Sequence, residues 1–240
     1  MGGRLLAETA KERGWKVSAM LNNDIVGGTV GTNGRKVDNV VRVFSEGIRA
    51  SEDLAGQMAR RNSGGEDDGP SRSLMRYADK VAAEAYPDVK LDVFGVRRPD
   101  RFARGGDHLP SLELGFPAIR YTVGVENYNH QHQDLRTEKD IEYGDTVDKM
   151  DFSYLAKVTA LNVLTATALA EAPPAPMSAT LGGAVTSDTT VKWDAALGAH
   201  RYRVYQRRAD AQDWTFVRDV DGTETVLEGL IVDDHFVGVS

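Results

Sequence analysis

The sequence predicts an α/β domain followed by a small all-β unit, and three observations carry this prediction. Strand and helix patterns alternate through the first 172 residues. Residues 173–176 contain three prolines and form a stiff, extended linker. Beyond them, short apolar runs are separated by turn residues, a pattern typical of an all-β unit. We therefore expect one domain over residues 1–172 and a second over residues 177–240.

The composition excludes several classes of protein and restricts any metal site. The chain has 240 residues, of which 41% are hydrophobic and 27% charged, as is typical of a globular, soluble protein. Its net charge of -7 argues against general binding to nucleic acid. We find no apolar run long enough to cross a bilayer. Because the chain has no cysteine, aspartate, glutamate and histidine must supply the ligands of any metal.

The first domain is expected to begin with a short helix that leads into a strand. Leu6, Ala7 and Ala10 fall on one face of a helix over residues 4–13, which Gly14 ends. An apolar strand starting at Val17 follows and ends at an aspartate. Since a helix that leads into a strand implies an earlier strand, the pattern indicates that the chain begins inside a βαβ unit. The glycine-rich loop over residues 27–34 matches neither phosphate-binding pattern.

The later elements follow from apolar periodicity and turn residues. Residues 51–73 are polar and contain a mobile loop at 64–70. The next helix has an apolar stripe and could be capped by Ser71 or Ser73. The expected elements are strands over 38–44, 90–96 and 117–123, and helices over 71–86 and 151–170.

Asp24 is the first candidate site residue, because it ends an apolar strand. A charge in that place is costly to bury unless it is paired or binds a metal. Asn22, Asn23 and Gly27 surround it with polar and permissive backbone chemistry. The alternative is a solvated aspartate in a strand-to-loop turn, since these residue types are also typical of turns.

A second polar cluster runs from Arg104 to Pro110 and contains the adjacent pair Asp107 and His108. The pair could supply a metal ligand, an orienting carboxylate or a general acid. It could equally be a turn in which the aspartate caps the backbone. Adjacent side chains seldom point into one site, so both readings stay open.

A third cluster runs from Glu126 to Asp134, after the strand that ends at Val123. Open α/β sheets bind ligands at this edge. His130 and His132 would share one face of an extended segment, and neutral imidazole is a common zinc ligand. His200 and His235 lie in the β unit and are interpreted as surface or packing residues.

Together the three clusters resemble the C-terminal half of the catalytic domain of M28 family zinc peptidases. The resemblance covers about residues 1–170 and rests on the segments Leu21–Gly27, Arg104–His108 with Gly115–Ala118, and Tyr128–His132. It implies part of a phosphorylase/hydrolase-like α/β domain with two zinc ions. The implied reaction is aminopeptidase hydrolysis of N-terminal residues from a peptide substrate, outside the cell or in the periplasm.

The resemblance also implies roles for individual residues. Asp24 would ligate one zinc and His132 the other, with His130 as the alternative. Arg104, Asp107 and His108 would line the site. The family's first histidine, bridging aspartate and glutamate pair find no match, so the chain would lack the general base and be an inactive fragment.

The sequence departs from the family's pattern after the histidine. The family's His-Thr and Asp-Thr pairs appear here as His132-Gln133 and, after an insertion, Asp145-Thr146. The alternative function is a non-catalytic, peptidase-like binding module.

The second unit resembles a fibronectin type III domain. Thr190–Asp194 matches its tryptophan-bearing strand, Tyr202–Tyr205 the next strand, and Leu230 with Phe236 the tyrosine-corner region. The last strand of that fold finds no match, so we expect an incomplete sandwich with an exposed sheet edge and marginal stability.

Overall fold

The computed structural model describes residues 2–100 and 104–240 and divides the chain into two compact units. The first unit is Met1–Ala170 and the second is Glu171–Ser240. The division falls just before the proline-rich segment at 173–176.

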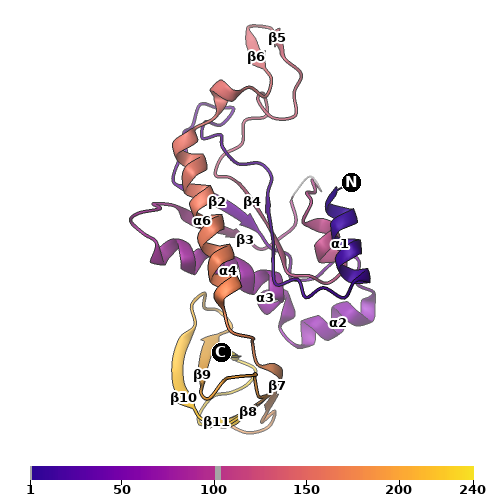
Figure 1. Cartoon of the computed structure of the whole chain (residues 1–240), viewed down its shortest axis with the longest axis vertical. Helices are drawn as coiled ribbons and strands as arrows, with labels where there is room; N and C mark the ends of the chain where they lie inside the picture. Colours follow the sequence, from indigo (N-terminus) through magenta and orange to yellow (C-terminus); the bar gives the residue numbers. More distant parts are fainter. Residues whose placement is uncertain (1, 101–103) are drawn as a thin grey trace. The chain divides into compact units, whose positions relative to one another are not determined.

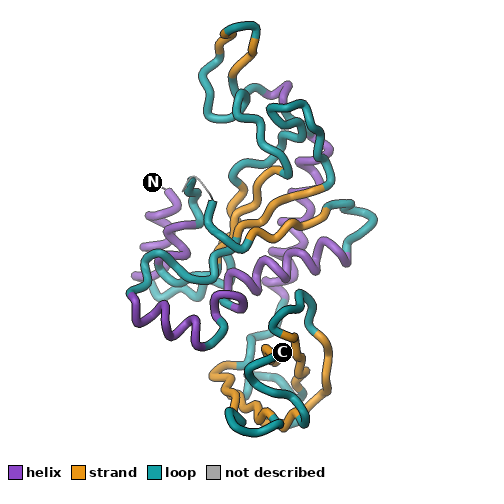
Figure 2. The backbone as a smooth tube through the Cα atoms, turned by 180° about the vertical axis from the view of Figure 1, so that it is seen from behind, coloured by secondary structure: helices purple, strands orange, loops and turns teal. Residues whose placement is uncertain are grey.

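A mixed four-stranded sheet forms the centre of the first unit (Figures 1 and 2). The strand order is β1-β4-β2-β3, in which β1 pairs in parallel with β4 and β2 in parallel with β3. The central pair, β2 and β4, is antiparallel. The strand bounds are Met20–Asn23 for β1, Val40–Phe44 for β2, Asp92–Val96 for β3 and Ala118–Val123 for β4.

Two long helices, α4 (Pro70–Glu84) and α6 (Phe152–Glu171), share one apolar core with this sheet. Figure 1 shows α6 crossing β2 and β4. The Tyr154 hydroxyl of α6 donates a hydrogen bond of 2.9 Å to the carbonyl of Val40, which fixes the helix to the sheet. The core residues include Leu74, Met75 and Ala78 of α4, Val158 and Leu161 of α6, and Val41, Val43, Ile119, Tyr121 and Val123 of the strands.

The polar stretch before α4 is more ordered than we predicted. It contains α2 (Leu54–Asn62) and α3 (Gly65–Asp68), so the expected mobile loop at 64–70 is wrong. The side chain of Asp53 caps α2 by accepting from the Gly56 N–H at 2.8 Å. Polar caps and ion pairs order this region, and apolar periodicity does not reveal them.

The predicted serine cap of α4 is also wrong. Its N-cap is Gly69, with Pro70 in the first turn. The Ser71 hydroxyl instead accepts from the N–H of Ala118 at 3.1 Å.

The remaining helices and strands of the first unit confirm most expected elements and add others. Helix α1 (Gly2–Glu12) matches the first expected helix, whereas β1 is only four residues long. The sequence did not predict helix α5 (Leu109–Glu113), the hairpin of β5 (Arg136–Glu138) and β6 (Ile141–Tyr143), or the 3-10 turn η1 (Val147–Lys149).

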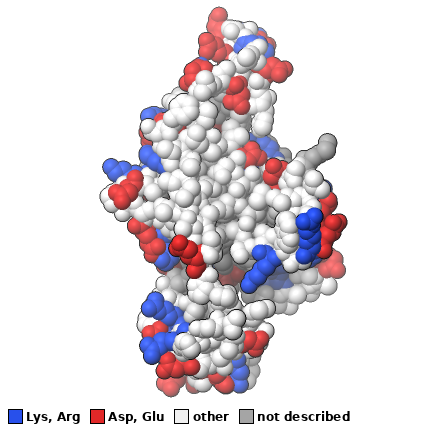
Figure 3. All heavy atoms as spheres, viewed as in Figure 1, with Lys and Arg blue, Asp and Glu red and all other residues white. Residues whose placement is uncertain are grey.

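The prediction that no apolar segment is long enough to cross a bilayer is wrong for helix α6. By length and composition alone α6 could cross a membrane, although the core helix of a soluble protein passes the same test. One face is buried in the core, and the other carries an apolar hollow that includes Phe152, Ala156 and Val163. Figure 3 shows few charged side chains over the middle of this unit on the α6 side.

The second unit consists of two three-stranded sheets around a small core. The sheet orders are β10-β9-β12 and β11-β8-β7, which leaves β12 at an edge among the described residues. The core includes Trp193 and Tyr202, whose rings meet edge to face with centroids 5.5 Å apart. The strand bounds are Met177–Gly182 for β7, Thr189–Asp194 for β8, Tyr202–Arg208 for β9, Thr215–Val220 for β10, Glu224–Leu227 for β11 and His235–Val239 for β12.

Candidate functional site

The parallel pairing of β1 and β4 brings the first and third polar clusters together. The carboxyl ends of parallel strands lie at the same edge of a sheet, so Asp24 and the loop after Val123 become neighbours. Backbone hydrogen bonds of 2.9 Å extend the ladder past β1, from the Asp24 N–H to the Tyr121 carbonyl and from the Val123 N–H to the Ile25 carbonyl. The ladder therefore fixes the backbone that carries Asp24.

A cavity of about 390 Å³ lies at this edge. Asp24 and His132 both line it, although 107 residues separate them in the chain. His130 is not among its lining residues, so the structure places His132 rather than His130 in the cavity that Asp24 lines. The full lining is Asp24, Ile25, Arg104, Gly105, Gly106, Arg120, Thr122, Glu126, Gln131 and His132.

The histidine segment is not extended, so the prediction that His130 and His132 share one face of a strand is wrong. The segment folds into turns, in which the His130 N–H donates to the Asn127 carbonyl at 3.2 Å. His132 itself has φ of 56°, in the left-handed region that few residues other than glycine adopt. The turn chemistry of Asn127 and Asn129 outweighs the alternating pattern.

The side chains of the adjacent residues Asp107 and His108 lie in different surroundings. Asp107 is exposed, and its side chain approaches Gly3 of α1, where an added Cβ would lie 2.7 Å from it. His108 is buried, and its Nδ1 lies 3.4 Å from the side-chain nitrogen of Asn22. Only the histidine of this pair therefore lies on the Asp24 side.

Gly106 lies between His108 and Asp24. A Cβ at this glycine would be 2.9 Å from Nδ1 of His108, 3.0 Å from Oδ2 of Asp24 and 2.6 Å from Nδ2 of Asn22. Three side chains thus converge on a space that only glycine leaves open.

The burial of His108 predicts a pH-dependent stability. Burial, followed by the charge of Arg120, lowers the pKa of His108 to about 4, so the folded state holds the neutral ring. The unfolded ring has an ordinary pKa of about 6.5. Its contribution to stability is therefore complete above pH 6.5 and is lost as the pH falls towards 4, by on the order of 3 kcal/mol. Chemical unfolding between pH 7 and pH 4 measures this loss.

The variant His108→Gln removes the titrating ring and should flatten the stability profile over that range. His200→Gln changes an exposed ring of the second unit and serves as the control. An unchanged slope in His108→Gln would contradict the assignment.

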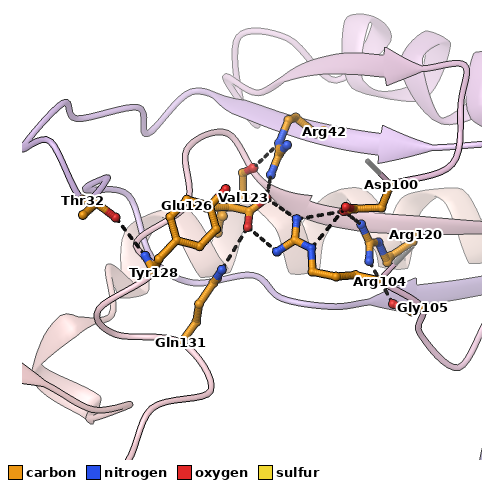
Figure 4. Close-up of polar contacts among 10 residues, drawn as sticks. All are labelled: Thr32, Arg42, Asp100, Arg104, Gly105, Arg120, Val123, Glu126, Tyr128 and Gln131. Carbon is orange, nitrogen blue, oxygen red and sulfur yellow. Dashed lines mark hydrogen bonds and ion pairs between the residues drawn. The ribbon is translucent and has the colours of Figure 1, made fainter. Parts of the chain in front are cut away.

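A chain of ion pairs, drawn in Figure 4, contributes Arg104, Arg120 and Glu126 to the lining of the cavity. It runs in the order Arg42, Glu126, Arg104, Asp100 and Arg120, with alternating charge. The Arg104 guanidinium lies 2.5 Å from Glu126 and 2.8 Å from Asp100. Arg120 lies 2.7 Å from Asp100, and both side chains are at least 96% buried. This part of the lining is thus built from paired charges.

Glu126 is ionised within this chain of ion pairs. Its burial alone would raise the pKa of the carboxyl, but hydrogen bonds from Arg104, Arg42 and Gln131 outweigh burial and lower the pKa to about 2. Three neighbouring side chains donate hydrogen bonds to the Glu126 carboxylate, so its charge is paired. Any effect of Glu126 on the cavity therefore passes through Arg42, Arg104 and Gln131.

The sequence did not predict the part played by Asp100, Arg120 and Gln131. A signal was present for Arg120, because this charge stands between apolar residues of an expected buried strand and must have a buried partner. Asp100 and Gln131 lie in loops, where no periodic pattern distinguishes them.

The residues at this edge fit a zinc ion only in part. Asp24 and His132 are ligand types that zinc accepts, and they line one cavity. A catalytic zinc has about three protein ligands, however, and the described residues contain no group of three histidine, aspartate or glutamate side chains that could hold a metal. The donors among the described residues are therefore too few for a complete zinc site.

Comparison with known proteins gives a consistent set of relatives. Over 99% of its length the chain is 39% identical to a protein named "probable zinc metalloprotease" from Leptosphaeria maculans. The identity is 37% to a protein of the same name from Pyrenophora tritici-repentis and 36% to one from Pyricularia oryzae, again over 99% of the chain. Over its whole length the chain is similar to proteins named as zinc metalloproteases.

These relatives are longer than the chain. It covers 56%, 50% and 49% of the three proteins, so it spans about half the length of the curated relatives it matches. No family model matches the chain. Among solved structures, titin kinase with its flanking domains superposes on 28% of the chain with 16% identity and a TM-score of 0.26.

Proposed function

We propose that this chain is part of a zinc-dependent peptidase of the M28 type that removes N-terminal residues from peptides. The observation that carries the proposal is the cavity at the β1 and β4 edge, which Asp24 and His132 both line. The similarity to proteins named as zinc metalloproteases supports it over the whole chain. The aminopeptidase reaction and the pair of zinc ions rest on the family resemblance of the three motifs.

In this proposal Asp24 and His132 each give one ligand to a different zinc ion. Zinc would supply a bound water of lowered pKa. The chain's own residues hold the site: His108 and Asn22 lie beside Asp24 around Gly106, and Arg104 and Arg120 line the same cavity as Asp24. The remaining ligands and the general base would come from polypeptide outside these 240 residues. We therefore propose that the chain alone is inactive.

Zinc titration tests this proposal in the chain and in a protein of the relatives' length. We expect calorimetry to show tight zinc binding only in the longer protein. We also expect only that protein to hydrolyse peptides with free N-termini. Asp24→Ala and His132→Ala should each abolish hydrolysis there, whereas the matched variant His130→Ala should retain it. Tight zinc binding and turnover by the 240-residue chain would contradict the incomplete site.

A second candidate function is a non-catalytic binding module with a peptidase-like scaffold. The observation that favours it is that the described residues contain no group of three metal-binding side chains. A longer protein that binds peptides but neither binds zinc nor hydrolyses them would support this function over the first.

A further inference from the structure

The Glu126 carboxylate lies at a junction of the cavity wall. It follows β4 by three residues, and its side chain is only 7% exposed. It accepts hydrogen bonds from Arg42 at 2.5 Å, from both terminal nitrogens of Arg104 at 2.5 and 2.9 Å, and from the Gln131 amide at 2.9 Å. Figure 4 shows these donors converging on it from different segments. One carboxylate therefore gathers three parts of the chain.

Each donor connects Glu126 to a different part of the site. Arg42 belongs to β2, so it ties the carboxylate to the rigid sheet. Arg104 directly precedes Gly105 and Gly106, which both line the cavity, and a Cβ at Gly106 would lie 3.0 Å from Asp24. Gln131 directly precedes His132. Glu126 thus joins the sheet to both loops that complete the cavity.

The backbone at His132 needs such an anchor. Its φ of 56° is a conformation that persists only where the surroundings fix it. Closer to β4, the loop is held where the Tyr128 N–H donates to the Thr32 hydroxyl at 2.9 Å. Next to His132, the amide of the buried Gln131 side chain donates to Glu126.

We propose that Glu126 is a positioning residue that holds His132 and Arg104 at the cavity wall. What these residues are held for rests on the proposed function, but the positioning itself can be measured without metal. A purely stabilising ion pair would protect the domain in general. A positioning residue protects the two loops specifically.

The chain offers a matched control in Glu52. This carboxylate is 9% exposed and also binds two arginines, Arg49 at 2.6 Å and Arg60 at a shorter distance. It lies beside α2 and does not line the cavity. Glu52→Gln therefore removes the same kind of charge at a comparable depth without touching either cavity loop.

Amide hydrogen exchange by mass spectrometry on the 240-residue chain tests the inference. In Glu126→Gln we expect exchange in peptides covering 104–109 and 127–133 to accelerate about ten-fold or more, the scale of a lost charge-assisted hydrogen bond. Exchange in β2 and α4 should stay near the wild-type rate. Glu52→Gln should accelerate exchange around 49–62 and leave both cavity loops unchanged.

A milder variant keeps the inference testable if Glu126→Gln fails to fold. Gln131→Leu removes only the donor amide, so it should accelerate exchange in 127–133 and leave 104–109 unchanged. The inference is overturned if hydrogen exchange in residues 127–133 of Gln131→Leu keeps the wild-type rate. It is also overturned if Glu126→Gln accelerates exchange uniformly throughout the first unit.

The outcomes separate this inference from the proposed function. Selective loosening of both loops in the chain, together with no zinc-dependent hydrolysis by the longer protein, would support positioning and reject the peptidase. Hydrolysis by the longer protein with unchanged loops in Glu126→Gln would support the peptidase and reject positioning.

Discussion

Replacing Arg120 by methionine should destabilise the first unit by about 3 kcal/mol, because it leaves a buried carboxylate short of one cation. The Arg120 side chain is 4% exposed and that of Asp100 3%. Arg120 also donates to the carbonyl of Gly105 at 2.9 Å, which the variant leaves unpaired. Asp100 keeps its ion pair with Arg104 in the variant. The expected loss of stability is therefore at the lower end of the range for removing one partner of a buried ion pair.

Urea unfolding followed by circular dichroism at about 222 nm measures this loss, since the described α-helices lie within Gly2–Glu171. Arg4→Met is the matched control, because it breaks only exposed ion pairs, such as that with Glu113, and should leave the free energy of unfolding nearly unchanged. Adding Asp100→Asn to Arg120→Met should restore part of the stability by removing the uncompensated charge. Equal losses in Arg120→Met and Arg4→Met would contradict the role of the buried pair.

Gly106→Ala should reduce zinc-dependent hydrolysis by the longer protein about 100-fold, a loss typical of groups displaced by about 1 Å. The added methyl group would lie within about 3 Å of Asn22, His108 and Asp24, all of which would have to move. The displacement falls on a proposed zinc ligand, so zinc affinity and turnover should decline together while the far-UV spectrum stays that of the wild type.

Gly105→Ala is the neighbouring control. Among the described residues, its Cβ would meet only the side chain of Leu109, with the nearest atom at 2.9 Å, and a leucine rotamer can move aside. Activity in Gly105→Ala should remain within about three-fold of the wild type. If both alanine variants kept full zinc affinity and activity, Gly106 would have no part in placing Asp24.

The sequence predicts elements well where apolar periodicity decides them and poorly where polar contacts do. Helix α6 and strand β4 follow from buried residues at regular spacing. Helices α2 and α3 do not, because a cap at Asp53 and the ion pairs of Glu52 order a stretch without an apolar stripe.

The candidate site shows the same division. Asp24 and His132 stand out in the sequence because a charge after an apolar strand and paired histidines are chemically unusual. Their meeting in one cavity depends on the pairing of β1 with β4, which is a contact between distant residues. The Asp100 and Glu126 contacts depend on loop geometry, so no local pattern could predict them.

The short strand β1 has a kinetic consequence for the backbone that carries Asp24. Among the described residues this strand pairs with β4 alone, over four residues, so it lies at an edge of the sheet. Edge segments with few hydrogen bonds detach by local opening, which requires far less free energy than unfolding of the whole domain. In the 240-residue chain the backbone that carries Asp24 would therefore open at a rate governed by fraying of one strand, while the core that α4 and α6 share with the sheet stays closed.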